Sequence, residues 1–284
     1  MEYTVSKDIL DVKTLLNETD ESLATSFGIS RMTLSRIVKN NSVPNKNTLE
    51  GIYSFIYKKG IRLNLLNEEL YKTNEDNNTR ILFHGSKDGI EGEIKVSHGG
   101  EKKDFGSGFY LGESVKQGIS FVSNYPNSSL YMFSLNLKKL DVIEFDVDVN
   151  WMILVAYFRG RIEEYKDSKK VKELLEIIKD KDVIIAPIAD NSMYSIINEF
   201  IEGSITGKQC INSLSANRLG KQYVLKTEKA IKSLTELKKC YICSLEKEDY
   251  ESQRETEKNV GKTKVILAKR EFAGKGLYIE QLLK

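Results

Sequence analysis

The stretch Arg80–Ser86 reads RILFHGS and opens the part of the chain that decides the fold. A short apolar run that stops at a glycine favours a buried β-strand over a helix. This run and similar ones later in the chain predict strands at Arg80–His84, Ser129–Leu137, Asp141–Asp146, Asp182–Ile188 and Lys221–Thr227. Helical periodicity predicts helices at Trp151–Tyr165, Lys169–Lys179, Met193–Glu202 and Glu228–Leu237. Because strands and helices do not alternate regularly, we expect an α+β domain rather than a doubly wound parallel sheet.

The residues before this stretch predict a small all-α domain. Ser6, Thr19, Ser30 and Thr48 each precede or begin a run with apolar residues at helical spacing, which indicates four capped helices. The polar segment YKTNEDNNT has no periodicity and is expected to be a linker. At the other end, a charged run precedes an expected strand at Lys264–Lys269 and a short helix. The predicted organisation is therefore an N-terminal domain (1–70), a linker (71–79), a main domain (80–240) and an extension that packs on it (241–284).

The segment ESLATSFGISRMTLSRIVKN, residues 21–40, resembles the helix-turn-helix of phage-repressor-like proteins. The resemblance implies that the outward face of its second helix reads DNA through Arg31, Thr33, Ser35, Arg36 and Lys39. Residues 28–62 contain seven basic residues against one acidic residue, an asymmetry that phosphate contacts need. The same bundle also serves proteins as a docking or dimerisation module, so both interpretations stay open.

Bulk properties exclude several classes of protein. The formal net charge is +2, so any attraction to nucleic acid has to come from local clusters. No apolar run approaches the ~20 residues of a membrane span, and the N-terminus lacks the apolar stretch of a signal peptide, which predicts a cytoplasmic protein without a membrane partner. The three cysteines are too few for a disulfide scaffold, and Cys240-x-x-Cys243 lacks a second ligand pair, so no metal is expected.

Three segments carry the chemistry: ILFHGSKDGI at 81–90, KDFGSGFYLGES at 103–114 and GKQYVLKTEKA at 220–230. Together they resemble the ADP-ribosyltransferase superfamily of the His-Tyr-Glu type, which includes the poly(ADP-ribose) polymerases and diphtheria toxin. The likeness is greatest to a bacterial branch that also carries a segment like IIAPIADNSMY, residues 184–194. It covers roughly residues 80–240 and implies a split β-sheet that binds NAD as a substrate.

The resemblance assigns roles residue by residue. His84 would bond a ribose hydroxyl, Gly85 would let its backbone approach the nicotinamide carboxamide, and Ser86 completes the trio. Tyr110, after the Gly106/Gly108 turn, would stack on the nicotinamide ring, and Phe121 would close its opposite face. The remaining cofactor-binding candidates are Gly108, Asp190 and Asn191. For the last two residues a helix N-cap is the competing interpretation.

Gln222 stands where the family has its catalytic glutamate. A glutamine keeps a hydrogen bond to the ribose 2′-hydroxyl but carries no charge and cannot act as a base. The expected catalytic residues are therefore His84, Tyr110 and Gln222, and the expected activity is transfer of one ADP-ribose to a protein or nucleic-acid acceptor. Arg218 and Lys221, in the preceding loop, would suit a phosphate-bearing target.

The same resemblance suggests a bacterial toxin, with an antitoxin protein as partner, or a phage-defence effector. Two alternatives remain because of Gln222. One is an inactive domain that acts as a DNA-binding regulator and senses NAD or ADP-ribose. The other is an enzyme that hydrolyses NAD with water as acceptor.

Overall fold

The computed structural model describes residues 2–216 and 220–283, without the side chains of residues 98, 99, 191 and 192. The chain divides into two compact units. Unit 1 comprises Met1–Glu91, Ser114–Leu135 and Thr235–Gln253, and unit 2 comprises Gly92–Glu113, Asn136–Leu234 and Arg254–Lys284. The described residues form thirteen α-helices and seven strands, so the fold class is α+β with a helical N-terminal region, as predicted.

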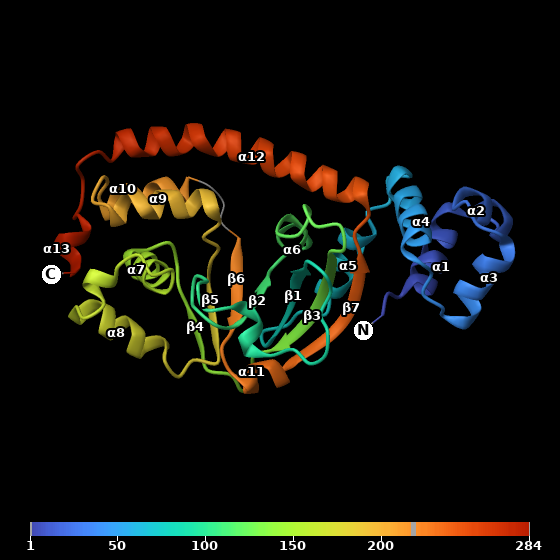
Figure 1. Cartoon of the computed structure of the whole chain (residues 1–284), viewed down its shortest axis with the longest axis horizontal. Coiled ribbons are helices and arrows are strands. Elements are labelled where there is room, and N and C mark those ends of the chain that lie inside the picture. Colours follow the sequence, from blue (N-terminus) through green and yellow to red (C-terminus); the bar gives the residue numbers. More distant parts are fainter. Residues whose placement is uncertain (1, 217–219, 284) are drawn as a thin grey trace. The chain divides into compact units, whose positions relative to one another are not determined.

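Unit 1 begins with the N-terminal helices, which gather into the blue bundle of Figure 1. Its elements are α1 (Val5–Leu16), α2 (Asp20–Ser26), α3 (Arg31–Asn40), α4 (Lys46–Lys58), α5 (Leu63–Lys72), β1 (Thr79–Ser86), α6 (Val115–Ser120), β3 (Ser129–Asn136) and β7 (Leu234–Tyr241), with the start of α12 (Ser244–Glu271). The three strands follow the order β1-β3-β7.

Capping residues explain where several of these helices begin. The hydroxyls of Thr19 and Ser30 accept hydrogen bonds from backbone N–H groups in the first turns of α2 and α3, as predicted. The start of α4 was predicted two residues too late, because Asn45 is its cap and accepts from the N–H of Thr48. The prediction for α1 was also wrong: Ser6 lies inside the helix, where its hydroxyl donates to the carbonyl of Val38.

The N-terminal bundle and β7 of unit 1 share one hydrophobic core, to which Tyr241 and Cys243 contribute. Asp8 on α1 and Lys238 on β7 form an ion pair, and each is only 3% exposed. The second carboxylate oxygen of Asp8 accepts a hydrogen bond from the Tyr53 hydroxyl at 2.6 Å. The helical bundle is thus held to the strand by a buried charge pair as well as by apolar contacts.

The segment expected to be a linker is short and held in place. α5 extends to Lys72, and β1 begins at Thr79. Between them, the carboxylate of Asp76 accepts hydrogen bonds from two following backbone N–H groups, and Glu75 accepts from the N–H of Ile81. These contacts order the connection between the helices and β1.

Unit 2 contains four strands in the order β4-β5-β6-β2. β4 and β5 pair in parallel, while β6 is antiparallel to both β5 and β2, so the strands form a mixed sheet. The elements are β2 (Phe109–Gly112), β4 (Val142–Glu144), α7 (Val149–Phe158), α8 (Lys169–Ile178), β5 (Val183–Pro187), α9 (Asn191–Ile201), α10 (Gly207–Ser215), β6 (Lys221–Leu225), α11 (Glu228–Lys232), most of α12 and α13 (Ile279–Leu283), with short 3-10 helices at Val96–Gly99 and Glu163–Tyr165. Trp151 and Phe200 are fully buried in its core.

Three sequence predictions in this part of the chain were wrong. The helix expected at Glu228–Leu237 stops at Lys232, because the following residues form β7. The helix expected at Trp151–Tyr165 ends at Phe158, two residues before Gly160, which adopts a left-handed conformation (φ +68°). The strand expected at Lys264–Lys269 belongs to α12, in which Val265 packs on the core of unit 2 while Ile266 and Leu267 stay exposed.

The last turns of α12 pack on the helices α9 and α10 of unit 2 through polar contacts. Lys269 forms an ion pair with Glu199 on α9 at 2.6 Å, and its carbonyl accepts from the side-chain amide of Gln209 on α10 at 3.0 Å. Among the described residues, no helix combines the length and apolar character that crossing a bilayer requires.

The buried pair between Asp8 and Lys238 gives a first prediction. Lys238→Met leaves the carboxylate of Asp8 buried without its cation, and we expect a loss of about 3–5 kcal/mol in the free energy of unfolding. The double variant Asp8→Asn/Lys238→Met should recover part of that loss. The measurement is urea unfolding. Lys13→Met, which breaks the exposed pair with Asp20, is the matched control and should cost less than about 1 kcal/mol.

A second prediction concerns Glu246 on α12, which is 5% exposed and accepts from the side-chain amide of Asn64 at 2.9 Å. Burial raises the pKa of Glu246 from 4.5 to about 8. Between these values the folded chain holds a proton that the unfolded chain has lost, so this group's contribution to stability falls as the pH rises from 4.5 to 8.

Glu246→Gln removes this titration, so the variant should melt at a higher temperature than the parent at pH 8, by an amount that shrinks toward pH 5. In free energy of unfolding, the gain of the variant at pH 8 should be a few kcal/mol at most. Glu248→Gln, on the exposed side of the same helix, should show no such pH dependence. A melting difference that is equal at both pH values would contradict the assignment.

Candidate functional site

Strands β2 and β6 bring Tyr110 and Gln222 to one face of unit 2. Tyr110 lies opposite Val224, and Gly112 lies opposite Gln222. Directly opposed residues point to the same face, and so do residues two apart along a strand, which makes Tyr110 and Gln222 diagonal neighbours. On its other side, Gln222 lies opposite Ala186 of β5. Its cross-strand neighbours are thus a glycine and an alanine, and Gln222 itself is only 6% exposed.

The side-chain amide of Gln222 has a fixed orientation. Its NH₂ group donates to Oδ2 of Asp104 at 2.8 Å and to the carbonyl of Pro187 at 3.0 Å. Both partners are acceptors, so the oxygen of the amide cannot take the place of the nitrogen. The oxygen itself accepts no hydrogen bond from the described residues. Gln222 therefore presents a free acceptor whose direction is set by the protein.

Asp104 is the centre of this arrangement and is 5% exposed. Its Oδ1 accepts from Nε and Nη2 of Arg159 at 2.9 and 2.5 Å, and its Oδ2 accepts from Gln222 and from the N–H of Ala189 at 3.2 Å. Arg159 also donates to the carbonyl of Ala189 at 2.6 Å and lies over the ring of Tyr194, 4.1 Å from its centre. The negative charge of Asp104 is thus neutralised beside Gln222.

Tyr110 is held by its hydroxyl, which donates to the carbonyl of Gly106 at 2.7 Å and accepts from the N–H of Phe105 at 3.1 Å. Burial raises the pKa of Tyr110 above its ordinary value, so the phenol stays neutral. Lys226 donates to the carbonyls of Phe105 and Ser107, and burial lowers its pKa to about 8. The backbone of the Gly106 turn thus holds the hydroxyl of Tyr110 in one place.

The two glycines of this turn have structural roles. Gly106 has φ +68°, and a Cβ there would lie 2.9 Å from the ring of Phe158. A Cβ at Gly108, predicted to be cofactor-binding, would lie 2.6 Å from Val224 and 3.1 Å from the carbonyl of Leu225. The absence of a side chain at Gly108 is thus explained by the approach of β6.

His84, Gly85 and Ser86 lie at the end of β1 in unit 1, where all three are half-buried. A Cβ at Gly85 would lie 2.1 Å from the carbonyl oxygen of Gly118 on α6, so only glycine fits there. The hydroxyl of Ser86 donates to the carbonyl of Gly89 at 2.7 Å. The close approach of Gly85 to α6 fixes the end of β1 against that helix.

α6 is held in turn from the N-terminal helices of unit 1. The carboxylate of Glu68 on α5 accepts from the N–H of Val115 at the start of α6 at 3.1 Å. Phe121, the residue that ends α6, keeps 54% of its surface exposed. The helix that packs on Gly85 therefore ends in an aromatic ring available to a ligand.

Asp190 caps α9: its carboxylate accepts from the N–H of Met193 at 2.9 Å, which favours the capping interpretation. Asn191 lies in the first turn of that helix, and its side chain is outside the described part of the structure. Arg218 is also outside the described residues. Lys221 forms an ion pair with Glu144, so its charge is already compensated.

The predicted cofactor-binding residues therefore fall into two groups, each described within its own unit. Unit 1 holds His84, Gly85, Ser86 and Phe121, whereas unit 2 holds Gly108, Tyr110, Asp190, Asn191 and Gln222. Sequence reasoning missed Asp104 and Arg159, which fix Gln222. The sequence did offer one signal, because Asp104 stands directly before the glycine-rich turn that leads into a predicted buried site. A carboxylate buried there is costly unless other residues donate hydrogen bonds to it.

Cysteine and metal chemistry have no evident place among the described residues. All three cysteines are buried, and burial raises the pKa of each thiol. In the described part of the chain, no three His, Cys, Asp or Glu side chains come together as metal ligands would.

The predicted nucleic-acid residues lie on α3 of unit 1. Gly28 has φ +69°, Ala24 is buried, and Leu34 and Ile37 face the core, as a helix-turn-helix requires. Arg31, Arg36 and Lys39 are exposed, and Thr33 and Ser35 are half-buried. None of the three cations forms an ion pair with a described residue. α3 therefore presents three exposed cations, two of which, Arg31 and Lys39, lie near enough to Asp20 to lower the pKa of its carboxyl.

One family model matches the chain over residues 80–235, which is more than half of its length, and it begins at the strand that carries His84. No significant match was found among curated proteins or among solved structures. The chain therefore belongs to the family described as "Protein of unknown function (DUF3990)".

Proposed function

We propose that residues 80–235 bind NAD and transfer its ADP-ribose to a single acceptor with release of nicotinamide. In this reaction the bond between C1′ and the nicotinamide nitrogen breaks, and its electron pair leaves with nicotinamide. The acceptor forms a new bond to C1′ and loses a proton. The observation that carries the proposal is the orientation of Gln222, whose amide oxygen is offered to a ligand hydroxyl.

Gln222 would accept a hydrogen bond from the 2′-hydroxyl of the nicotinamide ribose. That bond gains strength as positive charge develops at C1′, so it acts mainly in the transition state. A neutral amide cannot take a proton from the acceptor. The acceptor therefore has to be activated by another group, which favours one transfer per acceptor over chain elongation.

The other residues would bind NAD. The ring of Tyr110, pinned at its hydroxyl, suits stacking on the nicotinamide, and the exposed ring of Phe121 suits the same chemistry. His84 is assigned a ribose hydroxyl, Gly85 is assigned the nicotinamide carboxamide, and Ser86 completes the trio. The reaction as proposed requires no metal. The resemblance to bacterial transferases is the basis for proposing a toxin or phage-defence effector, with an antitoxin protein as partner.

A second candidate function is favoured by the same glutamine. If the missing carboxylate abolishes cleavage, the chain is a regulator that binds NAD without breaking it. NAD hydrolysis is the third possibility, with water as acceptor. Nicotinamide release that requires macromolecular acceptor indicates transfer, release without acceptor indicates hydrolysis, and NAD binding without release indicates the regulator.

We also propose that α3 binds duplex DNA through Arg31, Arg36 and Lys39. The support is the exposure of these three cations and the absence of ion pairs to described residues. A recognition helix of this kind places its side chains in the major groove, where cations contact phosphates and base edges.

A third prediction tests the proposed role of Gln222 in nicotinamide release. Gln222→Ala should lower the single-turnover rate of nicotinamide release at saturating NAD on the order of 10²-fold, as expected for losing one preorganised group at a developing charge. Gln209→Ala is the matched control, because Gln209 is also a buried amide of unit 2 and bonds a backbone carbonyl. If Gln222→Ala keeps the parent rate, the assignment of Gln222 is wrong.

Gln222→Glu checks the orientation of the amide separately. A carboxylate there would face Oδ2 of Asp104 and the carbonyl of Pro187, two acceptors that now receive hydrogen bonds. The variant should therefore lose more thermal stability at pH 8 than at pH 5, where protonation relieves the repulsion. An equal loss of melting temperature relative to the parent at both pH values would mean that the amide does not lie between these two oxygens.

A fourth prediction concerns α3. Binding of a random-sequence DNA duplex should weaken steeply with salt, and Arg36→Ala should reduce the slope of log K against log salt by about one. Lys7→Ala, an exposed lysine on α1, should leave the slope unchanged. The measurement is fluorescence anisotropy from ~50 to 200 mM salt. Absence of binding at the lowest salt would favour the docking interpretation.

A further inference from the structure

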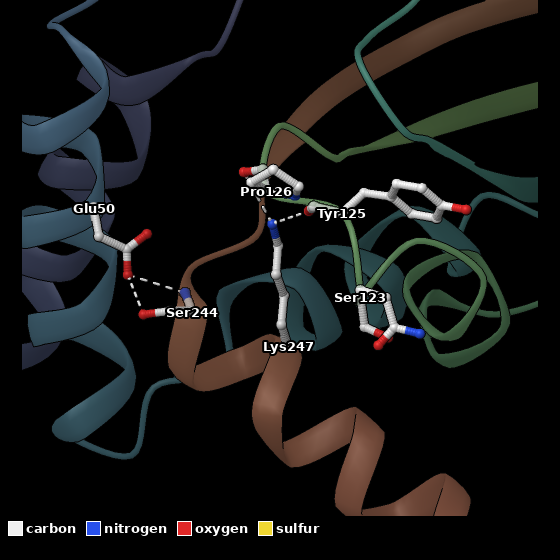
Figure 2. A pocket seen from close by; sticks show the side chains of 7 residues that line it. Glu50, Ser123, Tyr125, Pro126, Ser244 and Lys247 are labelled. Atoms are coloured by element: carbon white, nitrogen blue, oxygen red, sulfur yellow. Dashed lines mark hydrogen bonds between the residues drawn. The ribbon is translucent and has the colours of Figure 1, made fainter.

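Unit 1 contains a pocket of about 310 Å³ beside the loop that follows α6. Figure 2 shows its lining, which comes from α4, from this loop and from the start of α12. The lining residues are Glu50, Ser123, Asn124, Tyr125, Pro126, Ser244 and Lys247. None of them is assigned a role in the proposed reaction.

Both charged side chains of the lining, Glu50 and Lys247, already form hydrogen bonds within the protein. Lys247 donates to the carbonyl of Tyr125 at 2.8 Å, and Glu50 accepts from the N–H and hydroxyl of Ser244 (Figure 2). In contrast, Ser123 is only 6% exposed, and its hydroxyl has no hydrogen-bond partner among the described residues. The amide of Asn124 likewise has no such partner. The pocket thus offers unused polar groups beside an aromatic ring.

Two segments beside the pocket lack acidic residues, whereas Glu50 lines the pocket itself. Residues 22–49 and 114–140 contain no Asp or Glu, and the two segments meet where Lys46 of α4 donates to the side chain of Asn127 at 2.7 Å. Lys87, which follows β1, lies 4.4 Å from the ring centre of Tyr125. Lys46 and Lys87 are exposed and form no ion pair with described residues. Two uncompensated cations therefore flank the loop.

This surface continues toward α3. A second hollow of about 420 Å³ is lined by Arg36 of α3 and by Asn45, which caps α4 directly before Lys46. Positive charge therefore runs from the recognition helix, over the start of α4, to the loop with Tyr125. Such a path of cations that ends at an aromatic ring suits a nucleic-acid backbone with an unpaired base.

We propose that this pocket binds an unpaired nucleotide of a single-stranded nucleic acid. Lys46 and Lys87 contact its phosphates, and the base stacks on the ring of Tyr125, a residue that is 38% exposed. The polar edge of the base bonds the free hydroxyl of Ser123 and the amide of Asn124. A strand that leaves a duplex on α3 follows the basic surface into the pocket. This binding requires no NAD and does not depend on the proposed transfer.

The test compares a labelled blunt DNA duplex with the same duplex carrying a single-stranded tail of about ten nucleotides, in DNA and in RNA, by fluorescence anisotropy without NAD. The tailed probe should bind about 10-fold more tightly than the blunt one. Tyr125→Ala and Lys87→Ala should each remove most of this advantage and leave blunt binding unchanged. Lys46→Ala should do the same, while Lys46→Arg should retain it.

Lys58→Ala, at the opposite end of α4 from Lys46, is the matched control and should change neither affinity. Equal affinity for blunt and tailed probes would overturn the proposal, as would an equal loss in Lys58→Ala. Displacement of the tail by polyglutamate as readily as by single-stranded DNA would indicate an acidic protein partner instead. Displacement by a mononucleotide at the same concentration as by an oligonucleotide would show that no strand is recognised.

Discussion

A single buried carboxylate, that of Asp104, sets the arrangement of the candidate site in unit 2. An ionised carboxylate away from water is costly unless donors surround it, and Asp104 receives four, from Arg159, Gln222 and Ala189. Because these donors come from the end of α7, from β6 and from the turn before α9, one group ties three elements together. The loss of Asp104 would remove one hydrogen-bond acceptor from Arg159 and from Gln222 at the same time.

The orientation of the Gln222 amide follows from the position of the Asp104 carboxylate. A carboxylate on one side and a carbonyl on the other leave only the NH₂ of the amide to face them. A glutamate at this position would meet the same two acceptors, so the surroundings of residue 222 are built for an amide. The amide at position 222 is therefore matched by the residues around it.

In unit 1 the helix-turn-helix bundle and the strand that carries His84 belong to one compact body. The Asp8–Lys238 pair and the shared core hold the bundle to β7, while Glu68 caps α6, which packs on Gly85. A partner that binds α3 thus contacts the same unit that holds the end of β1. Nucleic acid bound along α3 and the pocket at Tyr125, as we propose, would therefore contact a single unit.

The sequence by itself determined the α+β class, the helical N-terminal region and most strands, because apolar periodicity and capping residues act locally. It also singled out His84, Tyr110 and Gln222 as candidates. It failed at β7 and in α12: a buried Lys238 looks like a surface residue until its partner, 230 positions away, is known, and Lys264–Lys269 looks like a strand outside its long helix. Only the tertiary structure decided the neighbours of Gln222, since Asp104 lies 118 positions away and hydrogen bonds between distant residues leave no local pattern.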